Sequence, residues 1–286
     1  MAIVLDNITY TYGMGTPFEK TALHGISLTI ENGEFLGVIG HTGSGKSTFV
    51  QHLNGLLHPT TGTVTVNGVD ISASTEEAKK MRHKVGMVFQ YPEHQLFEET
   101  IAEDIAFGPK NLGLSADEVD ERVRDAMKFV GLDYNTYAER SPFHLSGGQM
   151  RRVAIAGVVA MNPDFLVLDE PSAGLDPFGR EEIFEEIIRL HKEKEITVIL
   201  VSHNMEDISR MASRLVVLDK GRIVLDGEPM DIFNNHRDEL QAVGVDVPPV
   251  SVTMEYLREQ GLDVSNRVLS VDDAVQAILE GGSHVK

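Results

Sequence analysis

The sequence predicts an α/β fold in which helices cover the faces of a parallel sheet, and three observations support this. Short apolar runs suited to buried strands occur at residues 35–39, 165–168, 197–201 and 215–218. Helical segments such as residues 179–193 separate several of these runs, and alternation of strand and helix is typical of parallel sheets. The first run also leads through a glycine-rich turn into a segment of helical character.

The N-terminal region has the alternating pattern of antiparallel strands. Apolar residues alternate over 3–12 and again over 23–30, with a loop between the two segments. Residues 63–71 alternate around Asn67-Gly68, a dipeptide typical of tight hairpins. We expect these segments to form an antiparallel β subdomain beside the parallel sheet.

The middle of the chain is helical in character. Residues 101–106, 116–130 and 149–161 have helical spacing, and the pattern is broken at Pro92, Pro109–Gly113 and Pro142. A strand-like segment, residues 85–89, precedes this region. The sequence therefore predicts an inserted α-helical subdomain over residues 91–163.

After Gly227 the pattern weakens to short helical candidates around Val247-Pro248-Pro249. We expect a main domain of residues 1–228 and a small C-terminal module of residues 229–286, which would serve dimerisation or regulation.

Composition limits the class of protein. The 286-residue chain has no cysteine, which excludes disulfides and thiolate metal sites, and its net charge of −19 disfavours nucleic acid and anionic lipid headgroups. No apolar run approaches the ~20 residues that span a bilayer, and no secretory signal opens the chain. We expect a soluble protein that reaches a membrane through a protein partner, without direct insertion.

The glycine-rich turn is the main functional motif, and it reads Gly40-His41-Thr42-Gly43-Ser44-Gly45-Lys46-Ser47-Thr48. Its glycines let backbone N–H groups approach phosphates, and the following helix adds the positive end of its dipole. Lys46 should reach the β- and γ-phosphates of a nucleotide, and Ser47 should ligate Mg²⁺. Alone, this P-loop motif does not separate nucleotide phosphatases from kinases.

The apolar run at residues 165–168 ends in two carboxylates, Asp169 and Glu170. We expect Asp169 to hold Mg²⁺ through water, and Glu170 to orient and deprotonate the attacking water. An acidic pair after a strand is more often a solvated turn, but its combination with a P-loop favours the catalytic interpretation.

The motif Leu145-Ser146-Gly147-Gly148-Gln149 predicts a second anion-binding site, and it directly precedes a helix carrying Arg151 and Arg152. Ser146 and the two glycines form another helix N-terminus lined by amide groups. One chain needs two such sites if each site completes the nucleotide pocket of another subunit.

With this motif the sequence resembles the ATP-binding cassette ATPases, which are P-loop NTPases with a RecA-like core. Their head-to-tail dimers hold ATP between the P-loop of one subunit and this signature motif of the other. The resemblance covers residues 12–203. It implies catalytic roles for Glu170, His203 and Gln90, ATP binding by Tyr12, residues 40–48, Ser146, Gly147, Gly148, Gln149 and Asp176, and Mg²⁺ binding by Ser47, Gln90 and Asp169.

Each of these positions matches a family feature. Gln90 matches the glutamine that senses Mg²⁺ and the membrane partner, and His203 matches the switch histidine. Asp176 ends the loop that joins the two sites. Tyr12 matches the aromatic residue that stacks on adenine, although Phe18 could share this stacking.

Within the family, residues 89–108 resemble the ATPases of energy-coupling factor transporters, which power uptake of vitamins or of cobalt and nickel. The opening residues 13–20 and the C-terminal module resemble the second of the two non-identical ATPases in the vitamin-type complexes. This implies a peripheral protein on the cytoplasmic face of the cell membrane. Its partners would be a second ATPase, a transmembrane coupling subunit and a substrate-binding membrane subunit.

Three other interpretations remain open at this point. They are the homodimeric ATPase of a metal importer, the ATPase of an exporter or binding-protein-dependent importer, and a cassette ATPase without a transport role, such as a DNA-repair or translation factor. The last would involve nucleic acid, which the negative net charge disfavours.

The segment after Gln90 also predicts where a membrane partner binds. Apolar residues there are interleaved with the carboxylates Glu93, Glu98, Glu99, Glu103 and Asp104. We expect a groove with an apolar floor and an acidic rim that would accept a short basic helix. The alternative is an exposed helix start whose acidic residues favour its own dipole.

Overall fold

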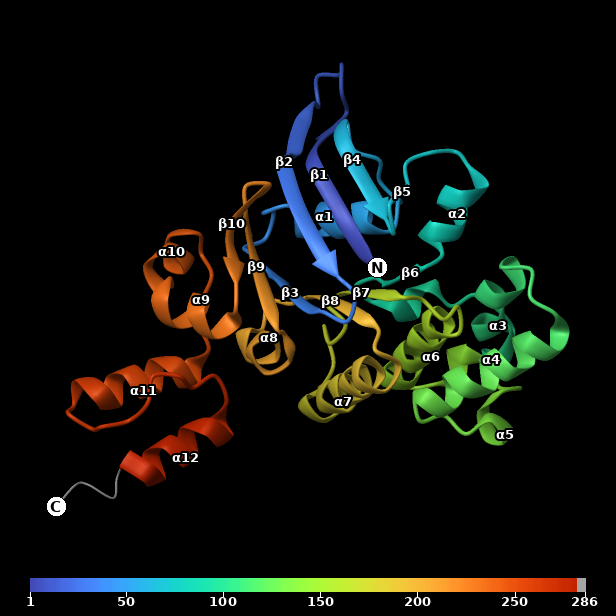
Figure 1. Cartoon of the computed structure of the whole chain (residues 1–286). Helices are drawn as coiled ribbons and strands as arrows, with labels where there is room; N and C mark the ends of the chain where they lie inside the picture. Colours follow the sequence, from blue (N-terminus) through green and yellow to red (C-terminus); the bar gives the residue numbers. More distant parts are fainter. Residues whose placement is uncertain (282–286) are drawn as a thin grey trace.

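The computed structural model describes residues 1–281, and within these residues a parallel sheet lies at the centre (Figure 1). The strand order is β10-β9-β3-β8-β7-β6, and all strands are parallel except β10, which pairs antiparallel with β9 at the edge. The strands are β3 (Phe35–Ile39), β6 (Val85–Val88), β7 (Phe165–Asp169), β8 (Thr197–Val201), β9 (Arg214–Asp219) and β10 (Arg222–Gly227). The α/β prediction is confirmed.

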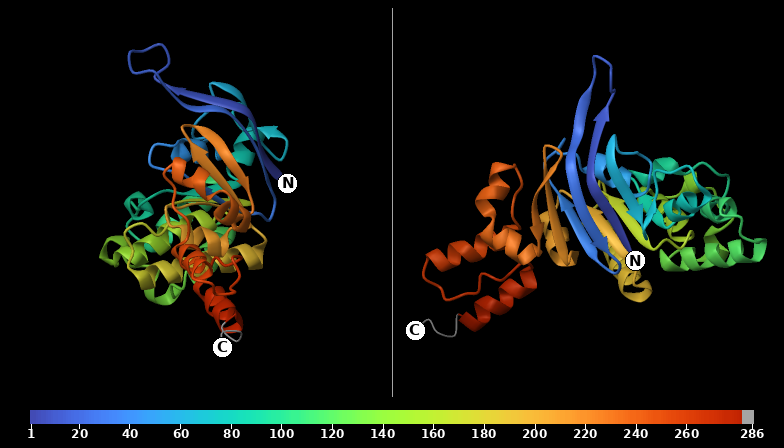
Figure 2. Two further views of the ribbon diagram at one scale, coloured as in Figure 1. Left: turned by 90° about the vertical axis from the view of Figure 1, so that its left-hand side faces the viewer. Right: turned by 45° about the horizontal axis from the view of Figure 1, so that its top comes forward.

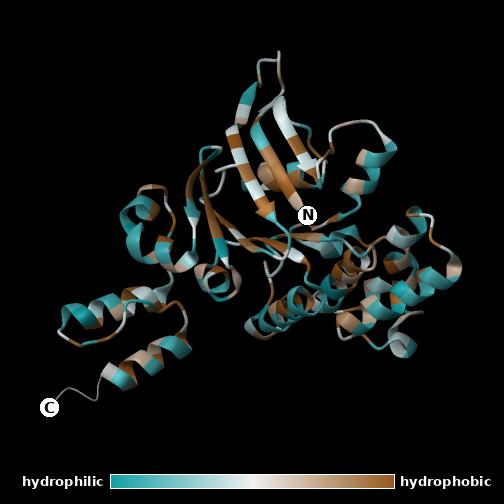
Figure 3. Cartoon of the chain, viewed as in Figure 1, coloured by the Kyte–Doolittle hydropathy of each residue, from teal (hydrophilic) through white to brown (hydrophobic). Residues whose placement is uncertain are grey.

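The sheet is buried on both faces because successive residues of a strand point to opposite sides. In β7, Leu166 and Leu168 contribute to the apolar core beneath the helices, whereas Phe165 and Val167 contribute to the core shared with the N-terminal strands. Every residue of β3, β7 and β8 is buried. Figure 3 shows these central strands as mainly hydrophobic and the outer helices as more hydrophilic.

The predicted antiparallel subdomain is confirmed as a second sheet with the order β2-β1-β4-β5. Its strands are β1 (Ala2–Tyr12), β2 (Lys20–Glu31), β4 (Thr61–Val66) and β5 (Val69–Asp70). Asn67 and Gly68 both have positive φ, as the tight turn between β4 and β5 requires. The hairpin of β1 and β2 projects beyond the rest of the molecule (Figure 2).

Helices follow the P-loop and fill the region between β6 and β7 (Figure 1). They are α1 (Lys46–Leu53), α2 (Glu76–Arg82), η1 (Pro92–Gln95), α3 (Ile101–Asn111), α4 (Ala116–Phe129), α5 (Tyr134–Tyr137), η2 (Pro142–His144) and α6 (Gly147–Val159). Helix α3 ends within the expected break Pro109–Gly113, but it ends at Asn111 and not before the proline, because it continues through the buried Pro109. Proline removes only one helix hydrogen bond donor there, and the chain leaves the helix just before Gly113, which has φ +77°.

Two further helices, α7 (Pro177–Lys194) and α8 (Met205–Met211), follow β7 and β8. The C-terminal helices are α9 (Pro229–Asn235), α10 (Arg237–Ala242), α11 (Pro249–Glu259) and α12 (Val271–Gly281). Helices α9 and α10 contribute Ile232, Phe233 and Leu240 to the main core. In contrast, α11 and α12 pack around a small core of their own that includes Met254. Residues 282–286 of the expected C-terminal module lie outside the described residues.

Among residues 1–281, none of the helices is both long and apolar enough to cross a membrane.

Candidate active site

The P-loop joins β3 to α1 in a conformation that only glycine accommodates. Gly40 has φ +152°, and a Cβ atom there would lie 2.3 Å from the carbonyl oxygen of Leu218. Gly45 precedes α1 in the left-handed region with φ 107°, and it brings no side chain over the helix N-terminus. The first N–H groups of α1 are therefore accessible to an anion.

Lys46 is held inside this loop. Its side chain is buried, and its Nζ donates hydrogen bonds to the carbonyl oxygens of Gly40 at 2.6 Å and His41 at 3.1 Å. Burial lowers the pKa of the Lys46 ammonium, and the carboxylates of Glu170 and Asp169 partly oppose this effect. The loop thus positions a cation at the site where phosphates would bind.

The two carboxylates at the end of β7 have different surroundings. Asp169 accepts a hydrogen bond from the Ser47 hydroxyl, and burial raises its pKa. The Oε1 atom of Glu170 is buried and has no hydrogen-bond partner among the described residues, and Nε2 of His203 lies 3.5 Å from it. Burial, together with the neighbouring Asp169, raises the pKa of Glu170 to about 7. A buried carboxylate oxygen without a hydrogen-bond partner is suited to accept a proton from water.

These groups line one cavity of about 580 Å³. Of the residues predicted from sequence, it contains Tyr12, Thr42, Gly43, Gly45, Lys46, Ser47, Thr48, Gln90, Asp169, Glu170 and His203. Gly40, His41 and Ser44 do not line it. The His41 ring turns away to Asp219, with Nε2 2.9 Å from Oδ1, and Ser44 is fully buried beneath the loop.

Sequence reasoning missed the wall of the cavity formed by β2 and the β9–β10 turn, which contributes Lys20, Thr21, Ala22, His24, Lys220 and Gly221. Gly221 has φ +72°, and a Cβ atom there would lie 2.2 Å from the carbonyl oxygen of Ala22. The positive φ favours glycine at this turn, but no recognisable motif marks the position in the sequence.

The aromatic residue beside the loop is Tyr12. Its hydroxyl lies 3.1 Å from the Thr48 hydroxyl, and its ring packs edge-on against Tyr10. Phe18 is 86% exposed in the β1–β2 connection and does not line the cavity. The geometry thus favours Tyr12 over Phe18 as the platform for a nucleobase.

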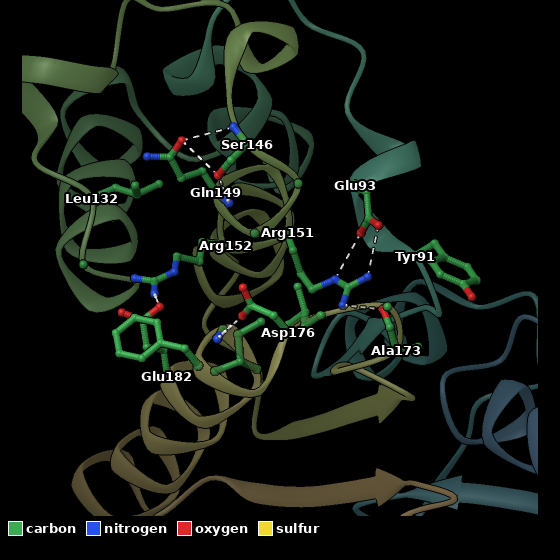
Figure 4. A pocket seen from close by; sticks show the side chains of 18 of the residues that line it. Tyr91, Glu93, Leu132, Ser146, Gln149, Arg151, Arg152, Ala173, Asp176 and Glu182 are labelled. Carbon is green, nitrogen blue, oxygen red and sulfur yellow. Dashed lines mark hydrogen bonds and ion pairs between the residues drawn. The ribbon is translucent and has the colours of Figure 1, made fainter.

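The signature motif lies in a different cavity of about 780 Å³ (Figure 4). Ser146 caps α6, and its side chain and that of Gln149 bond reciprocally to each other's backbone N–H groups. Asp176 lies in the same cavity and caps α7 by accepting a hydrogen bond from the Gly179 N–H at 2.7 Å. This cavity shares no lining residue with the P-loop cavity, so Ser146, Gly147, Gly148, Gln149 and Asp176 do not meet the P-loop within one chain.

The donor set near the P-loop fits Mg²⁺. Residues 1–281 contain no group of three or more histidine, aspartate and glutamate side chains that would form a complete metal cage. Mg²⁺ is usually bound by one or two protein ligands, with water and phosphate oxygens completing its coordination. The Ser47 hydroxyl and the Asp169 carboxylate, which contact each other, provide such ligands, and Gln90 lines the same cavity.

Comparison with known proteins identifies the family. The family model described as "ABC transporter" matches residues 23–173, slightly more than half of the chain. The energy-coupling factor transporter ATP-binding protein EcfA2 of Clostridium tetani is 53% identical over 98% of this chain and 97% of its own length. EcfA2 of Clostridium acetobutylicum is 54% identical, with the same coverage. The chain belongs to the ABC transporter ATPases of the energy-coupling factor type.

Solved structures of ABC ATPases agree with this assignment. The structure of cbiO1 from Clostridium perfringens, described as part of the ABC transporter complex cbiONQ, has a TM-score of 0.74 and 36% identity, and it covers 88% of this chain and 98% of its own. The ATP-binding cassette MJ0796, described as a dimer bound to ADP and Pi after hydrolysis, has a TM-score of 0.70 and 31% identity. It covers 79% of this chain and 98% of its own. The P-loop NTPase fold and the ATPase activity predicted from sequence are confirmed.

The raised pKa of Glu170 should make the free energy of unfolding of this ABC ATPase depend on pH. Because the folded state raises this pKa from 4.5 to about 7, the proton binds more tightly after folding, and the free energy of unfolding falls as the pH rises from about 4.5 to about 7. Glu170→Gln should therefore stabilise the nucleotide-free protein little at pH 5 and by up to about 3 kcal/mol at pH 8. Urea unfolding in the presence of a chelator measures this difference.

The matched control is Glu99→Gln, which makes the same change of net charge at an exposed position. Equal stabilisation of the two variants at pH 8 would show that overall charge, and not the burial of Glu170, causes the effect.

Proposed function

We propose that this chain is the ATP-hydrolysing subunit of an energy-coupling factor importer, and that it powers uptake of vitamins or other micronutrients by ATP-driven closure of an ATPase dimer. The observation that carries the proposal is the separation of the P-loop and signature cavities, which share no lining residue, so that a second subunit would be needed to bring the two motifs to one nucleotide. The similar cassette MJ0796 is described as a dimer bound to the products ADP and Pi, which supports a shared site.

The signature glycines support the same arrangement. A Cβ atom added at Gly147 or Gly148 would meet no described atom within 4 Å. Packing within the chain therefore does not require glycine at either position, whereas close approach of a phosphate from another subunit would.

In the proposed reaction, Lys46 and the N–H groups at the start of α1 bind the phosphates of ATP. Glu170 accepts the proton of the water that attacks the γ-phosphate, and ADP leaves. His203, beside Glu170, orients the γ-phosphate, and Tyr12 supports the adenine. Bound Mg²⁺, held by Ser47 and Asp169 with Gln90 nearby, would neutralise charge on the phosphates.

The proposed partners are a second ATPase, a transmembrane coupling subunit and a substrate-binding membrane subunit, and they place the chain at the cytoplasmic face of the membrane. We propose that residues 1–228 form the ATPase domain and that the module of residues 229–286 contributes to dimerisation or regulation. The exposed apolar residues Val271 and Val275 on α12 support this role.

Isolation of the complex from membranes tests the function. A tagged full-length chain should copurify with membrane subunits and with a second, distinct ATPase, which mass spectrometry identifies. A single ATPase species with membrane subunits would indicate the homodimeric metal importer instead. Absence of membrane subunits would contradict an importer role of either kind.

The structure corrects the expected docking groove after Gln90. Glu93 is paired with Arg151, and Asp104 accepts hydrogen bonds from the N–H groups of Phe97 and Glu98, so neither carboxylate belongs to a free acidic rim. Burial raises the pKa of Asp104. The accessible apolar surface is an edge-to-face pair of Phe97 and Phe107, which are 57% and 46% exposed and have ring centroids 4.9 Å apart.

This docking surface, defined by the two phenylalanines and the neighbouring Glu98, Glu99 and Glu103, still suits a basic, partly apolar helix of the membrane partner. Reversal of these three glutamates to lysine should prevent assembly of the complex, because it places like charges against the basic helix. ATP binding should persist, since none of the three lines the P-loop cavity. Copurification and equilibrium ATP binding measure the two effects.

A triple reversal of Glu121, Asp125 and Glu185 to lysine provides the matched control, because it makes the same charge change at exposed positions on α4 and α7. Normal assembly after reversal of Glu98, Glu99 and Glu103 would refute the docking surface, as would equal loss in the control.

A further inference from the structure

Arg151 is buried where three segments meet: its own helix α6, η1 and the loop after Glu170. Its side chain is only 2% exposed, and it is the largest by volume of the fully buried side chains among residues 1–281. The guanidinium donates from Nε and Nη2 to the two carboxylate oxygens of Glu93, at 3.1 and 3.0 Å. Its Nη1 donates to the carbonyl oxygen of Pro171 at 3.1 Å. The same nitrogen donates to the carbonyl oxygen of Ala173 at 2.8 Å (Figure 4).

The hydrogen-bond partners of Arg151 lie in two separate segments of the chain, η1 and the loop after Glu170. Glu93 lies on η1, three residues after Gln90 and just before the docking surface. Pro171 directly follows Glu170, and Ala173 lies in the loop that leads to Asp176 at the start of α7. One guanidinium therefore connects the segment beside the docking surface to the loop that carries the proposed base.

Such a connection is rigid for physical reasons. A guanidinium has a planar set of five N–H donors that matches a carboxylate in two-point geometry, and here the remaining nitrogen holds two backbone carbonyls. A shift of Glu93 that Arg151 did not follow would leave a buried charge unpaired, which is strongly unfavourable. A shift of Arg151 without the loop would leave buried carbonyls unsatisfied.

We propose that Arg151 and Glu93 form a positioning clamp that fixes the loop after Glu170 relative to the docking segment, so that movement of this segment changes the placement of the base. The proposal rests on the ATPase role proposed above. It assigns no contact with ATP to either residue.

Arg214 on β9 supplies an internal comparison. It donates from Nε and Nη2 to the two carboxylate oxygens of Asp226 on β10, at 2.6 and 2.7 Å, and from Nη1 to the carbonyl oxygen of Thr29 at 3.0 Å. This arginine therefore has the same kind of partners as Arg151, but neither Arg214 nor Asp226 lines the P-loop cavity or the signature cavity. Substitution of Arg214 and Asp226 therefore measures the cost of losing a comparable ion pair.

The test measures kcat and KM for ATP in the ATPase assembly that copurifies with the tagged full-length chain. Arg151→Lys keeps the charge but loses the planar fork, and Glu93→Gln removes the carboxylate. Both should lower kcat about tenfold or more while the KM for ATP stays within about twofold, because a small misplacement of the base affects the chemical step and not ATP binding. Arg214→Lys and Asp226→Asn should keep kcat within about threefold.

A double variant separates positioning from stability. Glu93→Gln with Arg151→Met removes both buried charges, so its melting temperature should lie above that of Glu93→Gln alone, which leaves the Arg151 charge buried and unpaired. Its kcat should be no lower than that of either single variant, because the two residues act as a unit.

Three results would overturn the clamp: an unchanged kcat in Arg151→Lys, an equal loss in the Arg214 and Asp226 variants, or multiplied losses in the double variant. None of these depends on the membrane subunits. Failure of the clamp is thus distinguishable from failure of the importer role, which copurification tests.

Discussion

Glu170→Gln should leave ATP binding intact and lower the rate of ATP hydrolysis by about two to four orders of magnitude, the usual effect of removing a positioned base. The amide has almost the same size as the carboxylate, but it cannot accept the proton of the attacking water. Its loss should not disturb the phosphate cradle, because the contacts of Lys46 within the loop are to backbone carbonyl oxygens and not to Glu170. Phosphate release and equilibrium binding of a fluorescent ATP analogue measure the two effects.

Glu206→Gln is a suitable control, since Glu206 is an exposed carboxylate at the start of the nearby α8. Hydrolysis by Glu170→Gln within a few-fold of the wild-type rate would show that another group acts as the base.

The assignment of Glu170 and not Asp169 as the base follows from the surroundings of the two carboxylates. Burial raises the pKa of both, but the Ser47 hydroxyl donates to Asp169 and stabilises its ionised form. In Glu170 the buried Oε1 atom has no hydrogen-bond partner among the described residues, and burial raises the pKa of this carboxyl to about 7. Two adjacent acids with different environments can take different roles, and we propose that Asp169 is the metal ligand and Glu170 the proton acceptor.

The sequence predicted those parts of the site that depend on local chain geometry. The P-loop needs glycine at particular φ values and a lysine at the first position of the helix that follows, and these requirements appear as a contiguous pattern. The same holds for the cap of α6 by Ser146 and for the Asn67-Gly68 turn. Strand and helix order predicted the parallel sheet for a similar reason, since neighbouring residues decide the pattern.

Features that depend on distant residues were not predicted. Glu93 appeared as part of an acidic rim because its partner Arg151 lies 58 positions away, and His41 appeared to face a nucleotide because Asp219 lies 178 positions away. Short helices such as α2 were also missed, because one or two turns give little periodicity and their stability comes from tertiary packing. Tertiary packing decides all of these features.

Lys46→Ala should weaken ATP binding itself by about ten- to a hundredfold, in contrast to Glu170→Gln, because hydrogen bonds to a charged group contribute about 1.5–3 kcal/mol each. The variant removes the buried cation that faces the phosphate site and leaves Asp169 and Glu170 without their neighbouring positive charge, so the cavity repels the polyphosphate. The same fluorescent ATP analogue measures the change in affinity.

Lys220→Ala is the matched control, because Lys220 lines the same cavity but its side chain is 85% exposed. An exposed ammonium is screened by solvent, and its removal should change the affinity by less than about fivefold. The contrast depends on burial, since both variants remove one positive charge from the same cavity. Equal affinity losses in the two variants would mean that general electrostatic attraction, and not the placement of Lys46 inside the loop, binds the phosphates.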